Sequence, residues 1–370
     1  MSALGSNSGR SGSRPASGAY SDGLSRSPSD VDSLGSRSSS RSSEDIRPVT
    51  YRTYALSSAM IFINELDRED CPLRIRTFVD GLLSPTTVST LGNDPSPSLA
   101  PLDAVSTNTS LRSTAAALAN EGKQCRLKEK AEWMDFARRV FSVFNRPLLY
   151  SCQSRNFDVR VSLGSGSHLH LSAPKPDLTF GLAIPQIHAP SLSLVPLVEL
   201  NDFYGLQPFS SPARPDIAFP FLIFEAKTDC GNMVAAENQA AHGAVKALAM
   251  MKTLDDIHRR VGGAQASPRL PVVVICSVGS LYEVFVAFDL STEEFPTSMS
   301  PTAALTLRPG IHLVEIWAGK VDYAETMLQL QLLLHRLLGW VLERWQPAIV
   351  GILNTVRAAT AAKAPETAQA

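Results

Sequence analysis

Residues 219–227 restrict the fold more than any other part of the sequence. They read FPFLIFEAK and are apolar up to the last three positions. A short run of this kind is typical of a β-strand that is buried on both faces in the middle of a sheet. Because side chains alternate along a strand, Glu225 and Lys227 are expected on the same face. The sequence therefore places a carboxylate beside an amine at the end of a buried strand.

The segments around this run predict an α/β fold, with a mixed central β-sheet flanked by helices. Apolar residues recur at helical spacing in three segments, and short apolar or alternating runs mark the strands. The expected helices are 111–145, in two pieces broken near Gly122, 233–260 and 321–345. The expected strands are 176–183, 219–227, 271–278, 282–290 and, at an edge of the sheet, 311–318, with a further hairpin at 157–163 and 168–172.

Composition divides the chain into four parts. Residues 1–45 form a Ser/Gly/Arg-rich tail that is expected to be disordered, because it contains almost nothing to bury. Residues 46–110 are interpreted as a docking segment followed by a Pro/Ser-rich linker. The globular domain is expected at 111–345, and 346–370 as the end of the last helix and a frayed tail. The serines of the tail, among them Ser27 before Pro28, are candidate phosphorylation sites, although a solvated tail without a specific role is the simpler interpretation.

Charge and cysteine content exclude several classes of protein. The formal net charge of −1 over 370 residues excludes a globally basic nucleic-acid coat, but not a local basic groove. The five cysteines are scattered and form no C-x-x-C pair, which argues against a disulfide framework or a structural zinc site. The sequence contains no signal-peptide pattern and no membrane-spanning run. We therefore expect an intracellular protein, nuclear or cytoplasmic, without a membrane partner.

The chemistry suggested by the strand ends is metal-assisted hydrolysis. Asp177 follows Pro176 at the start of one expected strand, and Glu225 closes another. Two carboxylates on adjacent strands can hold Mg²⁺ or Mn²⁺ through oxygen ligands, and the ion can bind the phosphate of a substrate. A lysine beside them, Lys227, can orient a water or donate to the phosphate. The simpler alternative is a solvated strand end with an incidental ion pair.

Pro176-Asp177 and Glu225-Ala226-Lys227, followed by AENQAAHGA at 236–244, resemble the PD-(D/E)xK nuclease-like domains of the restriction-endonuclease-like superfamily. The likeness covers about 111–345 and is to domains of the kind found in predicted fungal proteins. It implies a core of a helix, a three-stranded meander, a helix and a further strand. It also implies a metal-dependent nuclease, a hydrolase of nucleic-acid phosphodiesters. The alternative is a catalytically inactive nuclease-like fold that binds nucleic acid or protein.

The resemblance implies a role for each matching residue. Asp177 and Glu225 would be metal ligands, and the backbone carbonyl of Ala226 a third ligand. Lys227 would be the catalytic lysine, and Gln239 would join the site from the following helix. The ion would be Mg²⁺ or Mn²⁺.

Two positions in this assignment have alternatives. Asp216 also follows a proline and lies closer to Glu225 in sequence, so it would replace Asp177 if strand pairing brought it to the site. We favour Asp177 because a strand-like run follows it. The resemblance also implies a glutamate in the first core helix, which is either Glu129 or Glu132.

Four further patterns in the sequence are weaker candidates for a function. His168 and His170 form a candidate metal pair but lack a third ligand nearby in sequence. His242 and Lys246 share a helical face with Gln239 and are candidates to line the same groove. His258, Arg259 and Arg260, with Lys252, form either a basic nucleic-acid-binding patch or a solvated helix end. The Leu-rich segment 321–345 is either a core-covering helix, which we favour, or a homodimer interface.

Overall fold

A computed structural model describes residues 48–84, 104–146, 149–153, 174–183, 197, 200–202, 204–206, 208, 217–262, 269–295 and 308–367. The expected tail at 1–45, the hairpin at 157–172 with His168 and His170, and the alternative carboxylate Asp216 lie outside the described residues.

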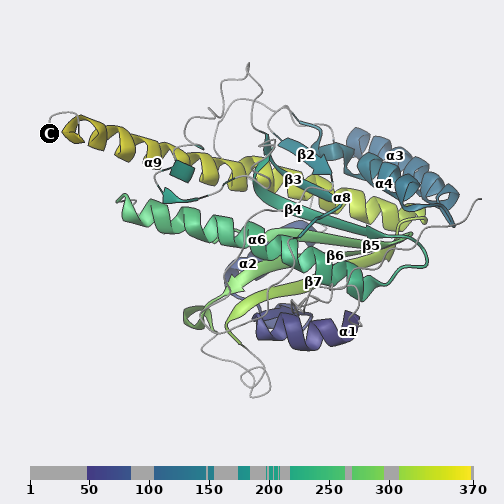
Figure 1. Ribbon diagram of the computed structural model, residues 1–370. Helices are drawn as coiled ribbons and strands as arrows, with labels where there is room; N and C mark the ends of the chain where they lie inside the picture. The colour runs from purple at the N-terminus through teal and green to yellow at the C-terminus, as the bar shows by residue number, and fades with distance from the viewer. Residues whose placement is uncertain are drawn as a thin grey trace, which may run out of the picture. The chain divides into compact units, whose positions relative to one another are not determined.

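A mixed sheet of seven strands forms the centre of the described part of the chain, in the order β1-β7-β6-β5-β4-β3-β2 (Figure 1). β4 pairs with β3 in antiparallel and with β5 in parallel orientation, so it is an interior strand, as predicted. β5 and β6, which correspond to the strands expected at 271–278 and 282–290, pair in antiparallel orientation as a hairpin. The strands are β1 (Ile61–Ile63), β2 (Leu149–Gln153), β3 (Leu178–Ala183), β4 (Ile217–Lys227), β5 (Val272–Val278), β6 (Leu281–Leu290) and β7 (Gly310–Lys320).

Helices cover both faces of this sheet. The main helices are α2 (Leu73–Leu83), α3 (Ala104–Gln124), α4 (Lys130–Val140), α6 (Met233–Arg260), α8 (Ala324–Trp340) and α9 (Gln346–Thr367). Short helical segments are α1 (Pro48–Thr50), η1 (Tyr51–Leu56), η2 (Arg68–Asp70), η3 (Phe141–Phe144), η5 (Thr292–Glu294) and η6 (Val341–Trp345). In the described residues, no helix has both the length and the apolar character needed to cross a membrane.

Alternation along β4 assigns its side chains to two separate cores. Ile223 packs in the cluster beneath α6, where Ala240 and Ala244 lie. Phe224 points to the other face and packs against Phe141 of η3, with ring centroids 4.9 Å apart. Residues Ile217 to Ala226 are all buried, as expected for a strand covered by helices on both sides. Glu225 and Lys227 follow Ile223 at steps of two and therefore lie on the α6 face.

Small residues let α6 lie close to the sheet near Asp177. A Cβ added at Gly243 would be 3.0 Å from Cγ2 of Ile223 and 3.1 Å from Cγ of Pro176. The alanines of 236–244 are the reason that this helix, predicted with its correct bounds, packs so closely over β4. The helix thereby covers the strand that carries Glu225.

Several details of the sequence-based fold are wrong or incomplete. The strand expected at the edge, β7, is the second strand, because β1 pairs with it in parallel and Ile61 lies opposite Ile311. α3 begins at Ala104, inside the expected linker, and the break before α4 falls at 125–129 rather than at Gly122. β2 has no counterpart among the predicted strands.

The C-terminal end of the chain is more helical than expected. α8 continues through η6 into α9, which ends at Thr367 rather than fraying over the last ten residues. The segment 358–364 is rich in alanine, the residue with the highest helix propensity. Leu330, Leu334 and Leu337 of α8 are completely buried within the chain, which supports the core-covering interpretation of this Leu-rich helix.

Candidate functional site

The directions of the strands bring distant segments together at one end of the sheet, where several strands start or stop. β4 and β5 are parallel and end there, whereas β3 is antiparallel to β4 and begins there. β6 begins there too, and β7 ends there, because each is antiparallel to its preceding neighbour. The residues just before β3 and those at the end of β4 are therefore neighbours, although about 50 positions separate them in the chain.

Asp177 and Glu225 are the two buried carboxylates at this end of the sheet. Their relative exposures are 7% and 3%. Leu178 pairs with Phe224, so the same register continued by one residue sets Asp177 beside Glu225. The Ala226 backbone N–H donates a 2.8 Å hydrogen bond to Oδ2 of Asp177. This bond fixes the carboxylate of Asp177 against the end of β4.

Two lysines neutralise the two carboxylates. Nζ of Lys227 lies 3.0 Å from Oε1 of Glu225 and also donates to Oε1 of Gln239. Nζ of Lys130, in the first turn of α4, lies 2.7 Å from Oδ2 of Asp177. The four predicted side chains of the site, those of Asp177, Glu225, Lys227 and Gln239, are thus brought together, with Lys130 as a fifth member.

Burial raises the pKa of Glu225 to about 7, and the negative charge of Asp177 acts in the same direction. The ammonium groups of Lys227 and Lys130 oppose this shift. Ionisation of Glu225 is therefore less favourable than that of an exposed glutamate. A cation that enters the site would favour the ionised form.

The remaining predicted residues have different surroundings. Ala226 contributes its backbone N–H to Asp177, whereas the resemblance implies a role for its carbonyl oxygen. Glu129 and Glu132 are exposed at the start of α4, and it is Lys130 between them that contacts Asp177. α4 therefore reaches the site through a lysine, which had no recognisable signal in the sequence.

His242 and Lys246 lie deeper in the fold than Gln239. Both are buried, and Nε2 of His242 is 2.8 Å from the hydroxyl oxygen of Tyr51 in η1. Burial lowers the pKa of Lys246 to about 8. The predicted helical face is thus divided, with Gln239 exposed at the site and the other two covered.

A second group of carboxylates adjoins the site across β5. Glu225 pairs with Cys276, and Cys276 pairs with Glu283 of β6. Burial raises the pKa of Glu283 to about 7, with further increases from Glu237 of α6 and Glu315 of β7. Arg52 of η1 opposes this shift and forms an ion pair with Glu237. This group was not predicted, because its members come from four separate segments.

The donor set of the first site fits a hard divalent cation that keeps much of its water. Within the described part of the chain, no group of three or more His, Cys, Asp or Glu side chains is placed to hold a metal ion. Asp177 and Glu225 supply two carboxylates, and Mg²⁺ commonly binds through one or two carboxylates together with waters and substrate phosphate. Mg²⁺ or Mn²⁺ fits this set, whereas a zinc site with four protein ligands does not.

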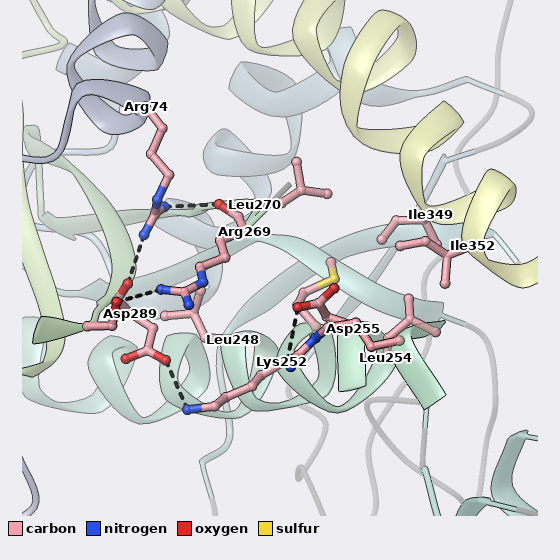
Figure 2. A pocket seen from close by; sticks show the side chains of 13 residues that line it. Arg74, Leu248, Lys252, Leu254, Asp255, Arg269, Leu270, Asp289, Ile349 and Ile352 are labelled. Atoms are coloured by element: carbon pink, nitrogen blue, oxygen red, sulfur yellow. Dashed lines mark hydrogen bonds and ion pairs between the residues drawn. The ribbon is translucent and has the colours of Figure 1, made fainter. Parts of the chain in front are cut away.

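A cavity of about 110 Å³ lies near the C-terminal half of α6, at the opposite end of the strands from Asp177 and Glu225 (Figure 2). Its basic residues are paired with carboxylates. Lys252 Nζ is 3.2 Å from Oδ2 of Asp289, and Arg259 is 3.5 Å from Oδ2 of Asp255 and also pairs with Asp256. The sequence pattern of Lys252 and Arg259 therefore corresponds to a neutralised helix end rather than to a free basic patch.

Residues 137–268 match the model of a family described as "Domain of unknown function (DUF7924)". The matched segment contains Asp177, Glu225, Lys227 and Gln239, but it ends before β5. The search of curated proteins found no match to the chain. The family description assigns no chemistry, so the function of the site is argued from its geometry.

Proposed function

We propose that this chain is a metal-dependent nuclease with a PD-(D/E)xK site. The observation that carries the proposal is the buried pair Asp177 and Glu225 on adjacent strands, with Nζ of Lys227 3.0 Å from Glu225. The order α4, β2, β3, β4, α6, β5 supports a restriction-endonuclease-like core, since it is a helix, a meander, a helix and a further strand. Such a nuclease would act in the nucleus or the cytoplasm.

Each residue of the site has a role in this proposal. Asp177 and Glu225 hold Mg²⁺ or Mn²⁺, which when bound supplies positive charge to the phosphate in the transition state. Lys227 donates a hydrogen bond to a phosphate oxygen or to the attacking water. Gln239 accepts from Lys227 and so holds the ammonium group in position. Lys130 contributes a second positive charge beside Asp177.

A second candidate function is a nuclease-like binding module without catalysis. It is favoured by one observation, which is that Lys130 and Lys227 already balance the charges of Asp177 and Glu225. The positive and negative charges of such a site are balanced without a bound cation. Metal binding is therefore the property that separates the two functions.

The test is cleavage of labelled single- and double-stranded DNA and RNA with Mg²⁺ or Mn²⁺. Wild type is compared with Glu225→Gln and Lys227→Met, and with Glu325→Gln as a control at an exposed position. We expect metal-dependent cleavage that falls at least about 100-fold in both site variants and is unchanged in the control. Thermal unfolding of each variant shows whether it remains folded.

Two results would contradict the nuclease. Equal cleavage by wild type and Glu225→Gln would assign the activity to a contaminant. No cleavage of any substrate, together with no thermal stabilisation by either ion, would support the binding module.

A further inference from the structure

Leu127, in the loop between α3 and α4, combines two unusual properties. It is 90% exposed, the highest value among the large exposed apolar residues of the described chain. Its backbone φ is 61°, a left-handed conformation that is unfavourable for leucine. Residues held in unfavourable backbone conformations cluster at functional sites, so the backbone of Leu127 makes this loop a candidate for contact with another molecule.

Specific contacts hold this loop in place. The Leu127 backbone N–H donates a 2.8 Å hydrogen bond to Oδ2 of Asp229, and Trp133 Nε1 donates to the same oxygen at 3.3 Å. Asp229 in turn lies against Gly279 in the β5–β6 turn, where an added Cβ would be 1.9 Å from its Oδ1. The loop is therefore fixed by the segment that follows β4.

The loop is connected to the site through two residues, Asp229 and Lys130. Asp229 is two residues beyond Lys227, and Lys130, three residues beyond Leu127, contacts Asp177. A polymer bound at Leu127 can therefore extend to the two buried carboxylates.

Basic residues flank Leu127 in the chain, and an ion pair of Arg126 links the loop to a segment with an exposed aromatic residue. Arg126 donates from Nε to Oδ2 of Asp322 at 3.0 Å, and the next residue, Tyr323, is 56% exposed. The ion pair of Arg126 with Asp322 therefore ties the loop to the segment that carries Tyr323. Lys123 and Lys128 are exposed on the same loop and the adjoining helix end.

We propose that this surface, formed by Lys123, Arg126, Leu127, Lys128 and Tyr323, binds an unpaired stretch of polynucleotide and leads it to the site. The inference rests on the proposed function and names its substrate class. The lysines contact phosphates, and Leu127 and Tyr323 contact the faces of bases. The faces of bases in an intact duplex are stacked on one another, so an unpaired strand is the form that offers them.

The test is binding by the full chain in the absence of divalent ions, so that no cleavage occurs. Labelled single-stranded DNA and RNA and a blunt duplex are titrated, and fluorescence anisotropy is measured. Leu127→Gly removes the side chain and suits the backbone conformation, and Tyr323→Ala removes the ring. Leu73→Ala and Tyr54→Ala are matched controls, because both residues are exposed at 71% and 69% on other parts of the protein.

We expect single-strand binding to weaken about tenfold in Leu127→Gly and in Tyr323→Ala, with no change in the controls. Lys128→Met is expected to lower the affinity for polynucleotides of every sequence to the same extent. It should also reduce the dependence of this binding on salt concentration. Unchanged single-strand binding in both surface variants would overturn the proposal. So would a preference for duplex that depends on Leu127, which would indicate a wedge between paired bases.

Cleavage assays separate this inference from the nuclease proposal. Metal-dependent cleavage with wild-type single-strand binding in Leu127→Gly would contradict the surface and leave the nuclease intact. Binding that depends on Leu127 without any cleavage would contradict the nuclease and support the surface as that of a binding module.

Discussion

Nζ of Lys130 lies 2.7 Å from Oδ2 of Asp177, the same oxygen that accepts the Ala226 backbone N–H. Lys130 is half-exposed and Asp177 is buried, so the ammonium group lies on the solvent side of this carboxylate. A divalent cation held by Asp177 would compete with this lysine for the same carboxylate.

Replacing Lys130 tests this competition. Lys130→Met is expected to lower the free energy of unfolding by about 1 kcal/mol without metal, because a half-exposed ion pair is lost. Added Mg²⁺ should then raise the melting temperature more in the variant than in wild type, since the cation replaces the lost positive charge. Lys128→Met is the control. Equal stabilisation of all three proteins by Mg²⁺ would show that Lys130 and the cation do not compete.

Asp229 is expected to determine the stability of the loop at 125–129. Asp229→Ala removes the acceptor for Leu127 and Trp133, which should cost about 1–3 kcal/mol of unfolding free energy. Trypsin should then cut faster after Arg126 and Lys128. Denaturant unfolding and limited proteolysis measure the two effects. Asp135→Ala, which removes an exposed ion pair with Arg138, should change neither.

Two glycines should respond in opposite directions to alanine. Gly279 has a φ of 55°, and a Cβ there would overlap Asp229, so Gly279→Ala should destabilise by at least about 2 kcal/mol. Gly339 lies in α8 with nothing within 4 Å of an added Cβ, and Gly339→Ala should stabilise by about 0.5–1 kcal/mol. Chemical denaturation of both variants tests the pair. Similar effects of the two substitutions would mean that the β5–β6 turn relaxes around Asp229.

Glu283 should make the protein less stable as the pH rises. Its pKa is raised from 4.5 to about 7 by burial and by Glu237 and Glu315, with Arg52 acting in opposition. Between these pH values the folded chain retains a proton that the unfolded chain releases, so the stabilisation present below pH 4.5 is lost as the pH rises through 7.

The variant Glu283→Gln cannot ionise at this position. Its stability should decline less than that of wild type between pH 4.5 and 7.5, and it should exceed wild type at the upper end of this range. Unfolding midpoints measured across the range test this, with Glu325→Gln as the control. Parallel profiles for wild type and Glu283→Gln would contradict the pKa shift.

The elements that the sequence identified are those whose pattern is local. The apolar run of β4 and the closely spaced alanines of α6 are visible in any short window, and both were predicted nearly residue by residue. The meeting of Asp177 and Glu225 was an expectation from two strand ends, and the β3–β4 register brings them together. β4 and α6 can thus be identified without knowledge of distant segments, whereas the meeting of the two carboxylates depends on the pairing of β3 with β4.

The features that were missed depend on long-range placement. Lys130 reaches Asp177 only because α4 packs against the sheet with its first turn at the site, and nothing in its neighbouring residues indicates this. β1 is three residues long, too short to carry a recognisable period, and its pairing with β7 made the predicted edge strand an inner one. Leu127 resembles any loop leucine until its φ and its exposure are seen.

The pairing of β1 with β7 also has a consequence for how the chain folds during synthesis. Asn64, at the end of β1, accepts a hydrogen bond from the Glu315 backbone N–H, 251 positions later. At about 5–20 residues per second, a ribosome needs roughly 10–50 s to make the intervening chain. Of the seven described strands, the first to emerge is thus the last to find its partner. During that interval Ile61, Phe62 and Ile63 are an apolar segment that a chaperone can bind.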